Sequence, residues 1–405
     1  MKKPIFILPL ALILCFMVSC QDKEAMAELN LQVVDARQAG MDPDRLARIP
    51  TRMREFVEEG RIAGAVMLLE RRDAIVLLEA VGYQDLETKK PMHVDTIFRV
   101  ASIAKPVTTI GIMLLQEEGR LAINVPLKRY LPEFDSLQVK GTDTPSRPVT
   151  IWGLMTHTSG FASERDIFKP SFLKKSLAEV VAIYAQSPLA YEPGTKFVYS
   201  SPGFDTLGRL IEVVSGKQYE AFIEERIFRP LGMKDSCFFV SPEKRGRLAS
   251  FYRTEDGKLH KGAKPNSFAG DLQHEGRVFP APAFGLYSTA PDLGAMLQMM
   301  LSGGTYNGRR ILSQASVTAM TVDKVMDEKK PPWGLGWTVT RQAGTFGYPF
   351  ASSRAYGHGG STGVFIWADP EKDLAGVFLI HQAGQESWHV GNIFMTMAAT
   401  AIADY

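Results

Sequence analysis

Strand-like segments lie near both ends of this chain, and helix-like segments fill its middle. Two apolar runs, 62–70 and 74–82, flank a short charged turn and predict a hairpin of buried strands. Helical patterns that begin at Asp42-Pro43 and close the chain at 386–403 are expected to flank these strands. Strand patterns return near the end of the chain, at 334–340, 355–357, 363–368 and 374–380. The simplest assembly is one antiparallel sheet to which both ends of the chain contribute.

The middle of the chain has a different pattern. Helical segments such as 177–186 and 203–215 recur there, and long connections rich in proline and glycine separate them. We therefore predict an α+β fold. Residues 41–120 and 281–405 form an α/β part, residues 121–280 form a mostly α part, and a functional site is expected in the crevice between them.

The first residues, 1–20, have the form of an export signal, with two lysines followed by an apolar run at 4–18. This run ends in Ser19 and Cys20, and a small residue before a cysteine resembles a bacterial lipoprotein cleavage site. Cys20 would then become the lipidated first residue, with 21–40 as a polar tether. Ordinary signal cleavage near Ser19 and an uncleaved anchor are the alternatives. We expect an exported protein, periplasmic or at the cell surface and anchored by lipid.

Charge, cysteine content and residue spacing argue against nucleic-acid binding, an intramolecular disulfide and a metal site. With 46 Lys and Arg against 44 Asp and Glu, the chain lacks the excess positive charge of a nucleic-acid-binding protein. Of its three cysteines, only Cys237 lies beyond the signal region, so no intramolecular disulfide is expected and Cys237 is interpreted as a small buried apolar residue. No cluster of His, Cys, Asp and Glu has convincing ligand spacing, so neither a metal nor a cofactor is predicted.

The pattern Ser-x-x-Lys occurs three times, at 102–105, 171–174 and 241–244. The second lies in a polar stretch, and the third reads as a solvated turn. Only the first lies between a strand-like segment, 96–100, and an apolar helical one, 107–118. This context makes the first occurrence the candidate for chemistry.

Ser102 and Lys105 are the right residue types for nucleophilic catalysis. Residues three apart on a helix share one face, which brings the amine beside the hydroxyl. A serine is a poor nucleophile at neutral pH without a neighbouring base. A lysine serves as that base when burial or nearby cations lower its pKa. We therefore predict that Ser102 is a nucleophile and that Lys105 activates it.

Three further stretches bear on this prediction. Tyr199 precedes an amphipathic helix; a tyrosine near a lysine can relay a proton, although a surface tyrosine is the alternative. The stretch 356–363, which contains His358, has four glycines and predicts a close approach to the backbone, or else a flexible hairpin loop. The stretch 155–161 is expected to be a structural loop in which His157 is an anchor and not a catalyst.

Taken in order, the motifs at 102–105, 199–201 and 358–360 resemble those of the serine hydrolases of the penicillin-recognising superfamily. The resemblance is to the class C β-lactamase-like group, which includes D-alanyl-D-alanine carboxypeptidases and carboxylesterases. The flanking stretches 154–160 and 334–337 are also similar to that group. The similarity extends from about residue 45 to the C-terminus.

The resemblance assigns roles to individual residues. It implies that Ser102 is acylated and that Lys105 and Tyr199 transfer protons. It implies that the backbone N–H groups of Ser102 and Ser361 form the oxyanion hole, with Gly360 beside them on the substrate-binding strand. A helix N-terminus at Ser102 favours negative charge there independently.

Two positions depart from the family pattern. Ser201 stands where the second motif usually ends in asparagine, so recognition of a substrate amide is weakened. His358 stands where β-lactamases have a lysine that binds the drug carboxylate, and a histidine is mostly neutral at pH 7. Efficient β-lactamase activity is therefore not expected.

Residues 359–363 also match the G-x-S-x-G nucleophile elbow of α/β-hydrolases. That elbow needs a helix after it, whereas 364–367 is strand-like. Ser361 is therefore not predicted to be the nucleophile.

The predicted function is a serine hydrolase that forms an acyl-enzyme at Ser102. Its expected partners are small carboxylic esters, or D-amino-acid and cell-wall-type peptides, with no nucleic acid and a membrane only through the lipid anchor. A true β-lactamase or a D-Ala-D-Ala carboxypeptidase is one alternative. A non-catalytic protein that binds or senses cell-wall peptides is another.

Overall fold

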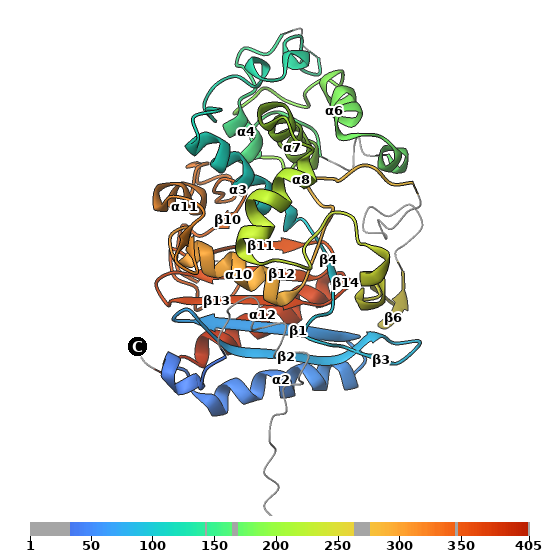
Figure 1. Ribbon diagram of the computed structural model, residues 1–405, viewed down its shortest axis with the longest axis vertical. Helices are drawn as coiled ribbons and strands as arrows, with labels where there is room; N and C mark the ends of the chain where they lie inside the picture. The colour runs from blue at the N-terminus through green and yellow to red at the C-terminus, as the bar shows by residue number, and fades with distance from the viewer. Residues whose placement is uncertain (1–32, 142–143, 164–168, 263–275, 345–346, 404–405) are drawn as a thin grey trace, which may run out of the picture.

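The computed structural model describes residues 33–141, 144–163, 169–262, 276–344 and 347–403 (Figure 1). The predicted signal segment, Cys20 and the first part of the predicted tether lie outside these residues. The rest of the tether is packed against the body of the protein. Val33 forms a bridge with Ile75, and the 3₁₀ helix η1 (Ala36–Ala39) follows.

The centre of the fold is a seven-stranded antiparallel sheet with strand order β10-β11-β12-β13-β1-β2-β3. Its strands are β1 (Gly64–Arg71), β2 (Ala74–Asp85), β3 (Lys90–Pro91), β10 (Thr338–Val339), β11 (Tyr356–Gly360), β12 (Val364–Asp369) and β13 (Leu374–Leu379). β1 and β13 join the two ends of the chain, with Val66 opposite Leu379. The prediction of one antiparallel sheet built from both chain ends is confirmed.

Alternate residues of β1 face two separate cores, because successive side chains of a strand point to opposite faces. Val66 and Leu68 pack in the core that contains α10 (Ala290–Leu301), whereas Met67 and Leu69 pack in the core on the other face. α2 (Pro43–Glu58) and α12 (Gln385–Thr400) cover that second face (Figure 1). The sheet therefore lies between two helical layers.

The mostly α part lies beyond the β10–β11 edge of the sheet (Figure 1). α3 (Ala104–Glu117) is buried from Ala104 to Leu115 and packs against α7 (Ser201–Ser215) of this part. The other α-helices are α4 (Ile151–Met155), α6 (Leu177–Ala185), α8 (Tyr219–Ile223), α9 (Arg229–Leu231) and α11 (Gln314–Thr321). Short helical turns connect them: η2 (Leu127–Arg129), η3 (Pro132–Phe134), η4 (Pro170–Lys174), the π-helical η5 (Glu224–Phe228) and η6 (Pro242–Arg247).

The strand that leads into Ser102, β4 (Phe98–Ala101), is not part of the large sheet. It pairs with β7 (Leu286–Ser288) in a two-stranded ladder that is irregular between Arg99 and Ala101. The remaining strands are β5 (Tyr252–Glu255), β6 (Lys258–Lys261), β8 (Thr305–Tyr306), β9 (Arg309–Arg310) and β14 (Gln382–Ala383). Sequence alone left the stretch 240–279 ambiguous; its β5–β6 hairpin is held by parallel pairing with β14.

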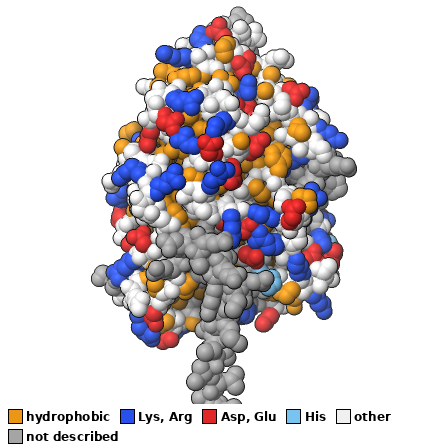
Figure 2. Space-filling view, in the orientation of Figure 1, with side chains coloured by type: hydrophobic (Ala, Val, Ile, Leu, Met, Phe, Trp, Pro, Cys, Tyr) orange, Lys and Arg blue, Asp and Glu red, His pale blue; other side chains and the backbone are white. Residues whose placement is uncertain are grey.

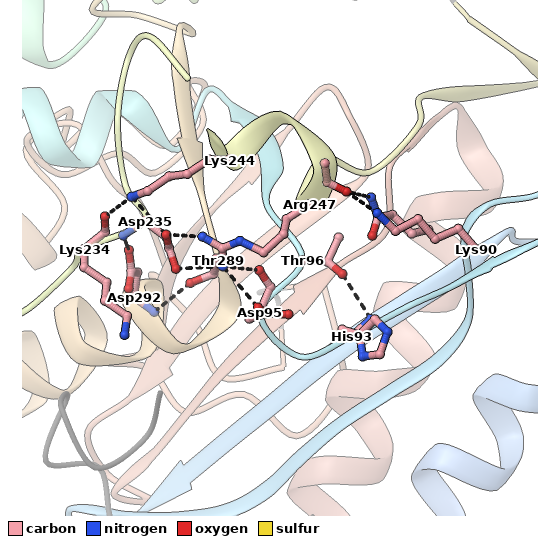
Figure 3. Close-up of polar contacts among 12 residues, drawn as sticks. Lys90, His93, Asp95, Thr96, Lys234, Asp235, Lys244, Arg247, Thr289 and Asp292 are labelled. Atoms are coloured by element: carbon pink, nitrogen blue, oxygen red, sulfur yellow. Dashed lines mark hydrogen bonds and ion pairs between the residues drawn. The ribbon is translucent and has the colours of Figure 1, made fainter. Parts of the chain in front are cut away.

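A network of charges fixes the chain beside β4 (Figure 3). The Arg247 guanidinium donates to Asp235 and Asp95. The Asp292 carboxylate accepts hydrogen bonds from the Asp235 N–H at 2.9 Å and from a neighbouring serine. Backbone bonds then tie Ile97, just before β4, to this segment, since its N–H donates to the Arg247 carbonyl at 2.9 Å. The network therefore fixes the start of the strand that leads into Ser102.

Lys and Arg side chains are interspersed with Asp and Glu over the face seen in Figure 2. Within the described ranges, none of the helices combines the length and the apolar character needed to span a bilayer. Cys237 is half-buried, and burial raises the pKa of its thiol to about 11, which keeps the thiol protonated at neutral pH.

Candidate active site

Ser102 lies at a sharp turn between β4 and α3. Ala101 has a φ of 45°, in the left-handed region that a non-glycine residue rarely adopts, and this reverses the chain after the strand. The Lys105 N–H then donates to the Ser102 carbonyl at 3.0 Å as the helix begins. α3 starts at Ala104, earlier than the predicted 107, because Pro106 falls in the first turn, where no N–H is needed.

The Lys105 side chain is fully buried between the first two motifs. Its Nζ lies 3.4 Å from Ser102 Oγ and 3.4 Å from Ser201 Oγ. It also donates to the Ala283 carbonyl at 2.9 Å and lies 4.5 Å from the centre of the Tyr199 ring. The Lys105 amine thus contacts Ser102 of the first motif, Ser201 of the second motif and the Tyr199 ring. Ser201 and Tyr199 are far from Lys105 in the sequence.

The Ala283 carbonyl was not predicted as part of the site. Its segment is fixed by α7, where the Asp205 carboxylate accepts the Ala283 N–H at 3.1 Å. It is fixed also by α3, where the Thr108 hydroxyl donates to the Pro282 carbonyl at 2.9 Å. A Cβ atom at Gly208 would lie 2.3 Å from Pro282, so α7 admits this segment only with a glycine there. The two closely spaced prolines at 280 and 282 are the only sequence signal for this rigid stretch.

Tyr199 is half-buried and immediately precedes α7. Ser200 caps that helix, with its Oγ accepting the Gly203 N–H at 3.3 Å. The Tyr199 ring contacts His157, with ring centres 4.4 Å apart, and Trp333, with ring centres 5.8 Å apart. Trp333 was not predicted from the sequence to be a site residue. It directly precedes Gly334–Trp337, the stretch that was noted for its similarity to the family.

The glycines of β11 permit contact with β4, the strand that leads into Ser102. A Cβ atom at Gly360 would lie 2.5 Å from the Val100 carbonyl oxygen, so only glycine fits there. Two residues later, the Thr362 hydroxyl donates to the Arg99 carbonyl at 2.6 Å. The predicted close approach to this glycine-rich strand is therefore made by the backbone of β4, and it brings the third motif beside the first.

His358 is buried in a single tautomer. Its Nδ1 lies 2.8 Å from the Gly359 carbonyl, so Nδ1 carries the hydrogen and Nε2 is the acceptor. Nε2 has no hydrogen-bond partner within the described part of the chain. Burial, together with the nearby charge of Lys105, lowers the pKa of His358 to about 3. The third motif therefore presents a neutral acceptor where a lysine would present a cation.

Ser361 lies in the turn that follows β11, and its side chain is exposed. β12 begins at Val364, directly after this turn. Because a strand and not a helix follows Ser361, the geometry of a nucleophile elbow is absent at this position.

The family comparison agrees with this geometry. The family model described as Beta-lactamase matches residues 49–399. The chain belongs to the Beta-lactamase family. Its members include β-lactamase-fold serine hydrolases such as esterases, and the superfamily resemblance inferred from the three motifs is confirmed.

Several relatives of this Beta-lactamase family member cover most of its length. It is 32% identical to Protein Rv1367c of Mycobacterium tuberculosis, over 81% of this chain and 88% of that protein. It is 28% identical to Esterase EstB of Burkholderia gladioli, over 72% and 78%. It is 26% identical to an N-acetylmuramyl-L-alanine amidase of Bacillus subtilis, over 85% and 82%.

The fold of this family member is also found in solved structures. EstCE1, described as a hydrolase with promiscuous acyltransferase activity, matches with a TM-score of 0.75 and 24% identity, over 89% of this chain and 99% of that one. At this level of identity the match shows the shared fold alone.

Proposed function

We propose that this protein is a serine hydrolase that cleaves small carboxylic esters through an acyl-enzyme at Ser102. The observation that carries the proposal is the buried amine of Lys105, which lies within 3.4 Å of the Ser102 hydroxyl and beside the Tyr199 ring. A serine needs such a neighbouring base to act as a nucleophile.

In the acylation step, Ser102 Oγ attacks the acyl carbon of the ester. Its proton passes to Lys105 or Tyr199, and the same pair returns a proton to the departing alcohol. The negative charge on the acyl oxygen is stabilised by the backbone N–H groups of Ser102 and Ser361. The ester C–O bond breaks, and a new ester to Ser102 forms.

In the deacylation step, water attacks the Ser102 ester. Lys105 and Tyr199 accept the proton of the water, and a proton returns to Ser102 Oγ as the carboxylic acid leaves. Acid and alcohol are then the products, with the enzyme unchanged and no co-reactant consumed other than water.

The preference for uncharged esters over β-lactams rests on His358 and Ser201. His358 is a neutral acceptor at pH 7, because burial and Lys105 hold its pKa near 3, so it offers no positive charge to a drug carboxylate. Ser201 contacts Lys105 Nζ at 3.4 Å and lacks the amide group with which an asparagine would bind a substrate amide. The name of the Burkholderia gladioli relative, Esterase EstB, favours the same substrate class.

Cleavage of cell-wall-type or D-amino-acid amides is the second candidate. The observation that favours it is the Bacillus subtilis relative named N-acetylmuramyl-L-alanine amidase. A β-lactamase, a D-Ala-D-Ala carboxypeptidase and a non-catalytic peptide sensor remain as alternatives that the same experiment separates.

The test is labelling with a fluorophosphonate probe, followed by a substrate panel. Wild type should be labelled and Ser102→Ala should not, whereas Ser171→Ala, which changes another Ser-x-x-Lys serine that is exposed, should be labelled like wild type. An unlabelled wild type would overturn the enzyme proposal, and labelling that survives in Ser102→Ala would overturn the residue assignment. Turnover of p-nitrophenyl butyrate, nitrocefin and a D-Ala-D-Ala peptide then ranks the substrates.

We also propose that the protein is exported and lipid-anchored at Cys20. Metabolic labelling with a fatty acid should mark wild type and not Cys20→Ser, and wild type should fractionate with membranes. A wild type that takes up no fatty acid would rule out lipidation.

A further inference from the structure

Tyr199 lies at the end of a segment, 190–200, that the structure describes without a helix or a strand. Such a segment needs hydrogen-bond partners from elsewhere to hold one conformation. They come from the loop after α4, residues 156–162. The bonds that join the two include Ala190 N–H to Gly160 O at 2.8 Å, Tyr191 O–H to Phe161 O at 3.3 Å and Gly194 N–H to Thr158 O at 2.7 Å. Closer to Tyr199 they include Val198 N–H to His157 O at 2.8 Å, Ser200 N–H to His157 Nδ1 at 3.1 Å, and Ser200 O–H to Ala162 O at 2.7 Å.

His157 makes the two bonds that enclose Tyr199. Its carbonyl accepts the N–H of Val198, and its Nδ1 accepts the N–H of Ser200, so the residues before and after Tyr199 are both held by one residue. The rings of His157 and Tyr199 are also in contact, with centres 4.4 Å apart. His157 therefore contacts both the backbone around Tyr199 and the Tyr199 ring.

The backbone of His157 is itself unusual, with a φ of 57°. This left-handed conformation turns its carbonyl and its ring toward the same segment, and few residues other than glycine and asparagine adopt it readily. The side chain is buried, and its ring also contacts Trp333, with centres 5.0 Å apart. The surrounding packing thus fixes the ring in one orientation.

The hydrogen bond from Ser200 requires a neutral ring. Because Nδ1 accepts, the hydrogen of the imidazole is on Nε2. Burial, together with the nearby charge of Lys105, lowers the pKa of His157 well below its usual value, which keeps Nδ1 available as an acceptor at neutral pH.

We propose that His157 is a positioning residue that holds the Tyr199 phenol against Lys105 by fixing the backbone on both sides of it. The inference rests on the proposed function, since it concerns the proton transfer to and from Ser102. His157 contacts neither Ser102 nor the amine of Lys105 in any described hydrogen bond, and it acts only through Tyr199.

Three substitutions separate the parts of this role. His157→Asn places an amide oxygen where Nδ1 lies and tolerates the positive φ. His157→Gln places its amide farther out, near the position of Nε2, and His157→Ala removes both. We expect acylation by p-nitrophenyl butyrate to fall about 100-fold in His157→Ala and His157→Gln, because displacement of a catalytic group by about 1 Å has this effect. His157→Asn should retain most of the rate, and His389→Ala, at an exposed histidine of α12, should match wild type.

A double-mutant cycle with Tyr199→Phe distinguishes positioning from general stability. If His157 acts through the phenol, His157→Ala should add little to the loss already caused by Tyr199→Phe. If the two losses multiply, His157 does not act through Tyr199 and the inference is wrong. Equal acylation in His157→Ala and wild type would also overturn it.

A second readout does not depend on activity. In protein labelled with tyrosine carrying ¹³C at Cζ, the Tyr199 signal is assigned by its loss in Tyr199→Phe. It should shift or broaden in His157→Ala and remain near its wild-type position in His157→Asn. A signal unchanged in His157→Ala overturns the positioning inference alone. An unlabelled wild type in the fluorophosphonate experiment overturns the proposed function, so the two failures are distinguishable.

Discussion

Gly360 on β11 lies against Val100 on β4, so closely that a Cβ atom at Gly360 would be 2.5 Å from the Val100 carbonyl oxygen. This contact joins the strand of the third motif to the strand that ends at Ser102. The relative position of the first and third motifs therefore depends on the absence of a side chain at Gly360.

We predict that Gly360→Ala separates the two strands and lowers acylation of Ser102 about 100-fold. The added methyl group should also lower the free energy of unfolding by about 1–3 kcal/mol, as overpacking usually does. Gly246→Ala is the matched control, because nothing lies within 4 Å of a Cβ atom at Gly246. Stopped-flow kinetics with p-nitrophenyl butyrate and urea unfolding check both parts. Full activity in Gly360→Ala would show that β11 can shift without effect on the site.

Ser201→Ala removes one of the two hydroxyls that contact Lys105 Nζ at 3.4 Å. The lost hydrogen bond is long, so its loss should cost about 1.4 kcal/mol in transition-state stabilisation, which is a tenfold slower acylation. The rate of the acylation burst measures it, with Ser171→Ala as the control. An unchanged burst rate would mean that the Ser201 hydroxyl is not needed to hold Lys105 in place.

The pH dependence of hydrolysis should show no contribution from His358 between pH 5 and 8. The pKa of His358 is lowered from 6.5 to about 3 by burial and by Lys105, so the imidazole is neutral throughout this range and becomes charged only in stronger acid. The pH profile of kcat/KM for p-nitrophenyl butyrate is the measurement, compared between wild type and His358→Gln. An acid limb near pH 6 that disappears in His358→Gln would contradict the buried neutral state.

Glu70→Met should stabilise the protein, and more so at higher pH. The Glu70 carboxyl on β1 is buried, and neither oxygen has a hydrogen-bond partner within the described ranges. Burial raises its pKa well above the usual 4.5. Folding therefore favours the protonated acid, and the stability present below pH 4.5 is lost as the pH rises toward the folded-state pKa.

Thermal unfolding at pH 4.5 and pH 8 measures this effect. The Tm of Glu70→Met should exceed that of wild type by about 3 °C at pH 8, with a smaller difference at pH 4.5. Glu58→Met changes an exposed glutamate of α2 and should show no such pH-dependent gain. An equal gain at both pH values would mean that Glu70 folds as the carboxylate.

Much of the fold was predictable because the spacing of apolar residues along the chain reflects the local geometry of the backbone. The alternation of buried faces in β1 follows from the period of a strand, and the runs at both chain ends were correctly joined in one antiparallel sheet. The strand before Ser102 was also correctly expected, but not its partner. Pairing of β4 with β7 depends on a segment nearly two hundred residues later in the chain, for which the sequence of β4 holds no signal.

The proximity of Ser102 and Lys105 was predictable from the sequence, because residues three apart lie close together both in a helix and in the turn that leads into α3, where the Lys105 N–H donates to the Ser102 carbonyl. Tertiary structure decided the rest of the site. The Ala283 carbonyl reaches Lys105 because α3 and α7 hold an irregular segment in place. The residues on either side of Tyr199 donate hydrogen bonds to His157. Segments without periodicity take their conformation from such distant partners, and those partners exist only once the chain has folded.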